Sequence, residues 1–178
     1  MIQRAAVAVS CLILLAACQA PPPPEPELTA ADRQAIADEV LRLNQEFYEL
    51  SRPEDLEASM AYWAEGADAF FVGEPAVFAQ GIRVLNSKEE MAQFFGGMVG
   101  TRTSTNFDPQ ASYAAVLSPD VAVTVTEQHW NITDTLGVTG STFPLSSTTV
   151  WVKENGAWKV MHHHQSWTNN AIEEEGEG

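Results

Sequence analysis

The sequence predicts an α+β domain in which three N-terminal helices pack on a curved, mostly antiparallel sheet. In the first hundred residues, apolar side chains recur three times at the spacing of a helix. After the third stretch the period falls to two, and small or polar residues alternate with Val121, Val123 and Val125. Near the C-terminus, Asn155-Gly156 separates two such runs, which is the strongest two-residue signal for a β-hairpin. Because a sheet must bury its apolar face, we expect the helices to cover one side of it.

Three helices are expected before the long strands. The first follows Thr29, which forms a cap with Asp32, and its apolar stripe consists of Ile36, Val40, Leu43, Phe47 and Leu50. The second is short and starts near Pro53, with a stripe of Leu56, Met60 and Trp63. The third begins with a capping box over residues 87–90 and continues through Met91, Phe94, Phe95 and Met98. The glycines at its end are Gly96, Gly97 and Gly100.

Five strands are expected, at residues 67–72, 112–117, 121–131, 146–153 and 157–167. The first lies between the second and third helices, and the other four follow the third helix. No internal repeat is present in the chain.

The chain is strongly acidic, with 24 acidic and 9 basic side chains and a formal net charge of −15. We therefore expect no nucleic acid partner, because binding phosphates requires clustered Lys and Arg. The length of 178 residues corresponds to one domain of about 150 residues with terminal segments added.

Residues 1–17 are predicted to be a secretory signal peptide. Arg4 precedes an apolar run from Ala5 to Ala17, which is shorter than the about 20 residues needed to cross a bilayer. The run ends in Leu15-Ala16-Ala17-Cys18, which resembles the lipobox of bacterial lipoproteins. The resemblance implies that Cys18 is lipidated and becomes the new N-terminus. The alternative is an ordinary signal peptide followed by a chance cysteine.

The segments after the signal divide into a tether, a domain and a tail. Residues 18–27 contain the lipidated cysteine and a proline-rich tether that favours polyproline II. Residues 28–170 are predicted to form the folded domain, and residues 171–178 are expected to be an acidic disordered tail. Gln19 after the cysteine implies, by the same resemblance, the periplasmic face of the outer membrane in the cell envelope. The lipid would be the protein's only contact with the membrane. Cleavage removes Cys11, so the mature chain has no disulfide.

The segment from Trp151 to Ser166 carries a family motif of the form W-x-x-x-x-G-x-W-x-[IV]-x-H-x-H-x-S. This motif resembles the ending of NTF2-like proteins, and more narrowly of the SnoaL-like and kinase-association-domain branch. Residues 62–68 and Gly81 resemble the early segment of the same family. The resemblance implies a cone with a pocket between the concave sheet face and the helices. It leaves the function open, since this fold hosts isomerases, cyclases, dehydratases and catalytically inert hubs.

Glu127 and His129 are the first candidates for chemistry in the pocket. By alternation they share a face with Val121, Val123 and Val125, so they point inward if the valines face the core. A carboxylate and an imidazole two residues apart can act as an acid–base pair. The alternative is that this end of the strand lies beyond the helices and both side chains are solvated.

The histidine run supplies a third candidate. By alternation His162 and His164 share one face with Trp158 and Val160, and His163 shares the other with Gln165. The family resemblance implies that His163 and Gln165 look toward the pocket, and that His162 and His164 lie at the other face of the sheet.

No metal or other cofactor is expected. Two histidines at i and i+2 on a strand can bind zinc, but no cysteine and no third histidine at a suitable spacing supports such a site. The family does not generally require a metal.

Two aromatic residues complete the predicted binding set. Tyr62 lies off the stripe of the second helix and is expected to offer its hydroxyl at the pocket mouth, although simple exposure is the alternative. Trp151, in the family motif, is included among the ligand-binding residues with Tyr62, Glu127, His129, His163 and Gln165.

Three functions remain open from the sequence. The first is a membrane-anchored domain that binds a small, mostly apolar ligand in the cone. The second is a SnoaL-like cyclase, isomerase or dehydratase with Glu127, His129 or His163 as general base. The third is an oligomerisation module. A homodimer through the outer sheet face is expected, with His162, His164 and Trp158 in or near the contact.

Overall fold

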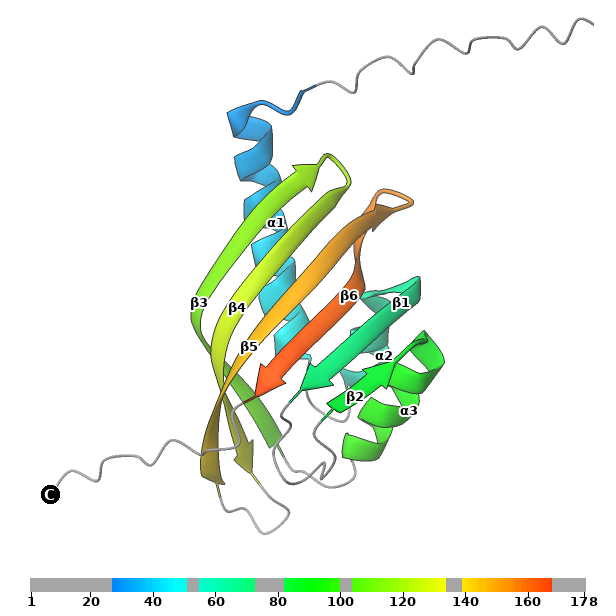
Figure 1. The fold of residues 1–178 in the computed structure, drawn as a ribbon, viewed down its shortest axis with the longest axis vertical. Helices are drawn as coiled ribbons and strands as arrows, with labels where there is room; N and C mark the ends of the chain where they lie inside the picture. The colour runs from blue at the N-terminus through cyan, green and yellow to red at the C-terminus, as the bar shows by residue number, and fades with distance from the viewer. Residues whose placement is uncertain (1–26, 51–54, 73–81, 100–103, 134–138, 168–178) are drawn as a thin grey trace, which may run out of the picture.

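A computed structural model describes residues 27–50, 55–72, 82–99, 104–133 and 139–167. The predicted signal peptide, Cys18, nearly all of the tether and the acidic tail lie outside these residues. Within them, three helices pack on one side of a single mixed sheet of six strands, so the predicted α+β fold is confirmed (Figure 1).

The elements follow one another in the predicted order, with one additional strand. The helices are α1 (Ala30–Glu49), α2 (Leu56–Ala61) and α3 (Lys88–Val99). The strands are β1 (Trp63–Val72), β2 (Ile82–Leu85), β3 (Ser104–Ser118), β4 (Val121–Thr133), β5 (Thr139–Glu154) and β6 (Ala157–Trp167). The sheet order is β2-β1-β6-β5-β4-β3, and all neighbours are antiparallel except the parallel pair β1–β6. The short strand β2 was not predicted.

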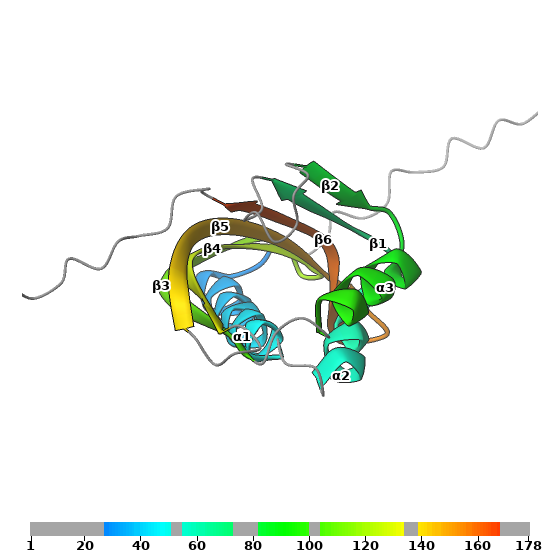
Figure 2. The ribbon, with the colours of Figure 1, turned by 90° about the horizontal axis from the view of Figure 1, so that it is seen from below.

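The sheet is strongly curved, and α1 lies along its concave side (Figure 2). We call this concave side, against α1, the inner face and the opposite side the outer face. The predicted cap of α1 is confirmed, because the Thr29 side chain accepts a hydrogen bond from the Asp32 amide and Asp32 accepts one from the Thr29 amide. None of the described helices is long and apolar enough to span a membrane.

The helical side of the domain differs from the prediction at α2. This helix ends at Ala61, and Trp63 begins β1 instead of completing the helical stripe. Trp63 is buried in the core, where its indole ring packs edge-on against Phe47 of α1. The start of α3 is as predicted, since the Ser87 hydroxyl accepts a hydrogen bond from the Glu90 amide.

The inner face of β4 consists of small and polar side chains. Ala122, Thr124, Thr126 and Gln128 are buried, whereas Val125 is 36% exposed. The expectation that the valines of β4 face the core is therefore wrong. Alternation defines two faces of a strand but does not say which is buried, and here α1 supplies polar partners for the threonines.

A β-bulge interrupts the regular pairing of β5 with β6. Trp151 is paired with Val160, while the preceding residue, Val150, is paired with His162. Met161 is thus the extra residue on β6. The bulge shifts the alternation of side chains between the two halves of β6.

The bulge changes which residues share a face. Val160 and His163 both lie on the buried side of β6, three positions apart. The expectation that His162 and His164 share a face with Trp158 is wrong for this reason. Trp158 is 5% exposed and donates a hydrogen bond from Nε1 to Glu39 of α1, so it lies toward the helix.

The hairpin between β5 and β6 turns at Asn155 and Gly156, as predicted. Both residues have positive φ, 53° and 82°, which is the conformation of a type I′ turn. The turn leads directly into β6, the strand that carries His163 and Gln165. It therefore helps to fix the register in which β6 pairs with β5.

Candidate functional site

The inner face carries an unusual number of buried polar side chains. Pairing across β4, β5 and β6 aligns them in rows: Thr124, Thr149 and His163 form one row, and Thr126, Ser147 and Gln165 form the next. Two further members come from α1 and one more from β4. The inner polar cluster comprises Asn44, Tyr48, Thr124, Thr126, Gln128, Ser147, Thr149, His163 and Gln165.

Asn44 joins α1 to the centre of this cluster. Its carboxamide oxygen accepts a hydrogen bond of 2.9 Å from Thr124 Oγ1, and its nitrogen donates one of 2.9 Å to Thr126 Oγ1. The indole N–H of Trp151 donates to Thr124 Oγ1 at 3.0 Å. Both polar atoms of Asn44 are thus satisfied, as buried polar groups normally are.

Tyr48 lies one turn farther along α1 and reaches β5. Its hydroxyl donates a hydrogen bond to Ser147 Oγ. Burial raises the pKa of Tyr48 to about 12, although the polar groups of Ser147, Gln165, Thr149 and Gln128 around the hydroxyl offset part of that increase. Tyr48 is therefore a neutral hydroxyl at any physiological pH.

His163 is 2% exposed and surrounded by aromatic rings. Its ring lies edge-on to those of Phe47 and Trp63, with centroids 5.7 and 6.0 Å away, and its Nδ1 is 2.9 Å from Thr149 Oγ1. Burial lowers the pKa of His163 to about 3, and the neighbouring His162 and His164 lower it further. The imidazole is therefore neutral at pH 7.

Gln128 is the exception to the satisfied cluster. It is 2% exposed, yet neither its Oε1 nor its Nε2 has a hydrogen-bond partner among the described residues. It lies close enough to the Tyr48 hydroxyl to affect the pKa of that group, but outside hydrogen-bond geometry. An unpaired buried amide lowers the free energy of unfolding by about 1–3 kcal/mol. A ligand that forms hydrogen bonds with the Gln128 carboxamide would recover this loss.

The structure places the predicted residues His163, Gln165 and Trp151 on the inner face. All three are buried, and His163 and Gln165 lie on the side that the family resemblance implies. Tyr62 lies at the margin, half-buried, where it donates a 3.2 Å hydrogen bond to Glu46 Oε2. Burial and that carboxylate raise the pKa of Tyr62.

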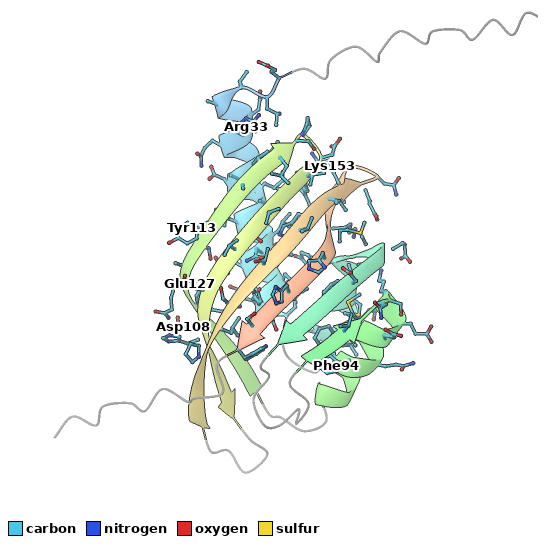
Figure 3. All side chains as sticks on the ribbon, viewed as in Figure 1. Arg33, Phe94, Asp108, Tyr113, Glu127 and Lys153 are labelled. Carbon is cyan, nitrogen blue, oxygen red and sulfur yellow. The ribbon has the colours of Figure 1, made fainter. Side chains whose placement is uncertain are left out.

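Glu127 and His129 lie elsewhere. Both alternate with the buried residues of β4, so they belong to the outer face, and Glu127 is exposed there. Figure 3 labels Glu127 on the β3–β4 side of the sheet, next to Tyr113. The expectation that Glu127 and His129 point into the inner face with His163 is wrong, because the parity of β4 is the reverse of the one assumed.

His162 and His164 are half-buried on the outer face. His162 Nδ1 is 2.6 Å from Asp68 Oδ1 on the paired strand β1, and His164 Nε2 is 3.2 Å from Ser166 Oγ. In the part of the chain that the structure describes, no three His, Cys, Asp or Glu side chains are grouped as a metal site would require. The described residues thus offer no ligand set for a metal ion.

Sequence reasoning missed Asn44, Tyr48 and Gln128. Asn44 and Tyr48 follow Val40 by four and eight residues, which places them on the same helical stripe as Phe47. Gln128 continues the run of Thr124 and Thr126 at a spacing of two. The helical spacing of Asn44 and Tyr48 and the alternation of Gln128 are both visible in the sequence. They were missed because only apolar residues were assigned to the buried faces.

The family model described as the SnoaL-like domain matches residues 40–170, about three-quarters of the chain. The chain belongs to the SnoaL-like domain family. The match includes every residue of the inner polar cluster, and the fold is the one seen in solved NTF2-like proteins. No curated protein sequence matches this SnoaL-like chain.

Solved structures with the same fold have diverse names. A putative dehydratase of the NTF2-like family from Streptomyces avermitilis is 18% identical, with a TM-score of 0.61, over 75% of this chain and 96% of that one. The association domain of C. elegans CaMKII is also 18% identical, with a TM-score of 0.59, over 75% and 97%. The hexachlorocyclohexane dehydrochlorinase LinA-type3 from Novosphingobium barchaimii is 12% identical, with a TM-score of 0.64, over 83% and 96%. At these identities the likeness shows the fold of the SnoaL-like domain alone.

The buried neutral His163 should make the domain sensitive to acid. Its pKa is about 3 in the folded chain and about 6.5 when unfolded, so the unfolded state binds the proton more strongly between these values. Stability is full above about pH 6.5 and falls with decreasing pH by up to about 1.4 kcal/mol per unit. Urea denaturation of wild type and His163→Gln from pH 7 to 4 measures this slope.

The difference between the two proteins isolates His163, because the carboxylates contribute equally to both. His163→Gln should lose most of the excess slope, whereas His129→Gln on the outer face should keep it. Equal slopes in wild type and His163→Gln would show that His163 is not buried as a neutral group.

The two carboxamides of the cluster should respond oppositely to apolar replacement. Gln128→Met removes an unpaired buried amide, so the free energy of unfolding should rise by about 1–3 kcal/mol. Asn44→Leu leaves two buried hydroxyls without their partner and should lower it by a similar amount. Chemical denaturation measures both, and a loss of stability in Gln128→Met would indicate that its amide is paired in the free protein.

Proposed function

We propose that this SnoaL-like domain binds a small, mostly apolar ligand between α1 and the inner face of the sheet. We propose further that lipid on Cys18 holds the protein at the periplasmic face of the outer membrane. The observation that carries the first proposal is Gln128, a fully buried carboxamide with neither polar atom partnered among the described residues. The face around it is lined by aromatic rings and mostly paired polar groups, and the Trp63 indole N–H is a further buried donor without a partner there. Sites for small molecules are mostly apolar with a few placed polar groups.

The surroundings of Gln128 supply both kinds of contact. Leu145 of β5 is paired with Gln128 and buried, and the ring of Tyr48 lies 5.6 Å from that of Phe47. Phe47 in turn contacts Trp63 and Trp151, farther along the inner face, at centroid distances of 5.6 and 6.4 Å. The hydroxyl of Tyr48 and the carboxamide of Gln165 lie near Gln128 at the same end of the cluster.

The enzymatic alternative has weaker support. It requires Glu127, His129 or His163 as a general base, but Glu127 is exposed on the outer face. With a pKa of about 3, His163 is a weak base at neutral pH. The dehydratase and dehydrochlorinase among the solved structures share the fold with this chain, and this likeness alone does not extend their reactions to it.

A neutral apolar probe tests ligand binding directly. We expect N-phenyl-1-naphthylamine, added to the ¹⁵N-labelled chain from Gln19 onward, to shift the indole resonances of Trp63 and Trp151 and the side-chain amide of Gln128. The side-chain amides of Gln34 and Gln45, which are exposed on α1, serve as the control and should not move. Saturable shifts confined to the outer face, or no shifts at all, would contradict the proposed function.

The proposed anchor has a separate test. Cys18→Ala should leave an unprocessed precursor that incorporates no labelled palmitate, because no thiol is left to accept lipid. Wild type should incorporate the label and partition with the membrane fraction. If wild type takes up no label, the lipoprotein proposal is wrong, and the ligand-binding proposal is unaffected.

A homodimer through the outer face is the second candidate function. Tyr113 and Val125 are directly paired on β3 and β4, and the Tyr113 side chain is 62% exposed. Thr148 and His164 continue the same row across β5 and β6. An exposed aromatic residue in a broad, weakly charged row suits contact with a second copy. Trp158 is not part of this surface, because it faces α1.

A charge placed in the row should separate the copies. In light scattering at tens of micromolar, wild type is expected to have the mass of a dimer and Tyr113→Lys that of a monomer. Gln34→Lys adds the same charge on exposed α1 and should remain dimeric. A monomeric wild type at this concentration would remove the proposal.

A further inference from the structure

We propose that Gln128 selects a neutral ligand group that donates and accepts a hydrogen bond side by side, as a carboxamide or lactam does. The inference rests on the proposed function and names the class of ligand for that same site. Its basis is the hydrogen-bond state of one residue and the absence of charge around it.

The two polar atoms of the Gln128 side chain can bind one ligand group through two adjacent hydrogen bonds. Oε1 accepts and Nε2 donates, from adjacent positions on one planar group. Both atoms are buried and neither has a hydrogen-bond partner among the described residues. A ligand group that is only an acceptor or only a donor forms a hydrogen bond with one of these two atoms. An amide-like group forms hydrogen bonds with both.

The side chain of Asn44 shows that a buried carboxamide in this fold can find all of its hydrogen-bond partners within the chain. Asn44 has partners on both of its atoms, Thr124 and Thr126, and thereby attaches α1 to β4. Gln128 lies two residues beyond Thr126 on the same face of β4. A structural role would be expected to bring partners with it, as it does for Asn44. The difference between the two residues indicates that the partner of Gln128 comes from outside the chain.

Charge decides between a neutral ligand and an anion. None of the buried side chains in the described part of the chain is Asp, Glu, Lys or Arg. His163 and Tyr48 are both neutral at pH 7 because burial disfavours their charged forms. A carboxylate or phosphate bound here would be buried without a cation, in a chain whose net charge is already −15. The site therefore favours an uncharged ligand group.

Three nearly isosteric probes separate these properties: benzamide donates and accepts, acetophenone only accepts, and benzoate is an anion. We expect the ¹⁵N-labelled chain from Gln19 onward, which contains every described residue, to bind benzamide through shifts of the Gln128 side-chain amide. Benzoate should bind at least tenfold more weakly than benzamide. In Gln128→Met the ratio of benzamide to acetophenone affinity should fall about fivefold to tenfold, as expected for the one hydrogen bond to Gln128 Oε1 that benzamide can donate and acetophenone cannot.

Glu127→Gln, one residue away on the outer face, is the matched control and should keep the wild-type ratio. The ¹⁵N spectrum of Gln128→Met reports whether the variant is folded, and Gln128→Leu provides a second variant if it is not. The inference is overturned if the ratio is the same in wild type and Gln128→Met, or if benzoate binds as well as benzamide. Failure of all three probes where N-phenyl-1-naphthylamine binds also overturns it and leaves the proposed function standing. Failure of all four contradicts both.

Discussion

The two hydrogen bonds from Asn44 to Thr124 and Thr126 fix the position of α1 on the sheet, and the rest of the inner face depends on them. They set the rotation of the helix about its axis, because Phe47 and Tyr48 follow Asn44 within one turn. Phe47 then packs against Trp63, Trp151 and His163, and Tyr48 reaches Ser147. A purely apolar stripe could slide along a row of threonines, whereas a carboxamide between two hydroxyls has one satisfied position.

The need of buried polar groups for hydrogen-bond partners also explains the properties of the candidate site. Buried polar groups need partners, and most of the inner polar cluster has them from α1 or from the adjacent strand. Gln128 has none among the described residues, and no buried charge lies near enough to make the site attractive to an anion. An uncharged, partly unsatisfied, aromatic-lined face is suited to holding a neutral molecule. The inner face is poorly suited to proton transfer. Burial holds His163 in its neutral form, and the alternation of side chains along β4 places Glu127 on the outer face.

Local signals in the sequence predicted the fold, whereas the site depends also on which face of each strand is covered by α1 and on how the strands pair. The Thr29–Asp32 cap, the Asn155-Gly156 turn and the motif from Trp151 to Ser166 were each sufficient to place an element. Alternation on β4 could not say which face is buried, since that depends on what α1 presents to it. The bulge at Met161 exists only in the pairing of β5 with β6, so the sharing of faces along β6 could not be counted from spacing. Strand β2, four residues long, was too short to show a period.

A crystal structure of the protein with benzamide tests the central claim most directly, since the claim concerns two atoms of one side chain. The account predicts the benzamide amide on the inner face, with its nitrogen and oxygen each about 2.9 Å from Oε1 and Nε2 of Gln128. The Asn44 bonds to Thr124 and Thr126 should be unchanged, because the ligand adds a partner and displaces none. Benzamide bound elsewhere, with the carboxamide of Gln128 paired to another residue of the chain, would contradict the account.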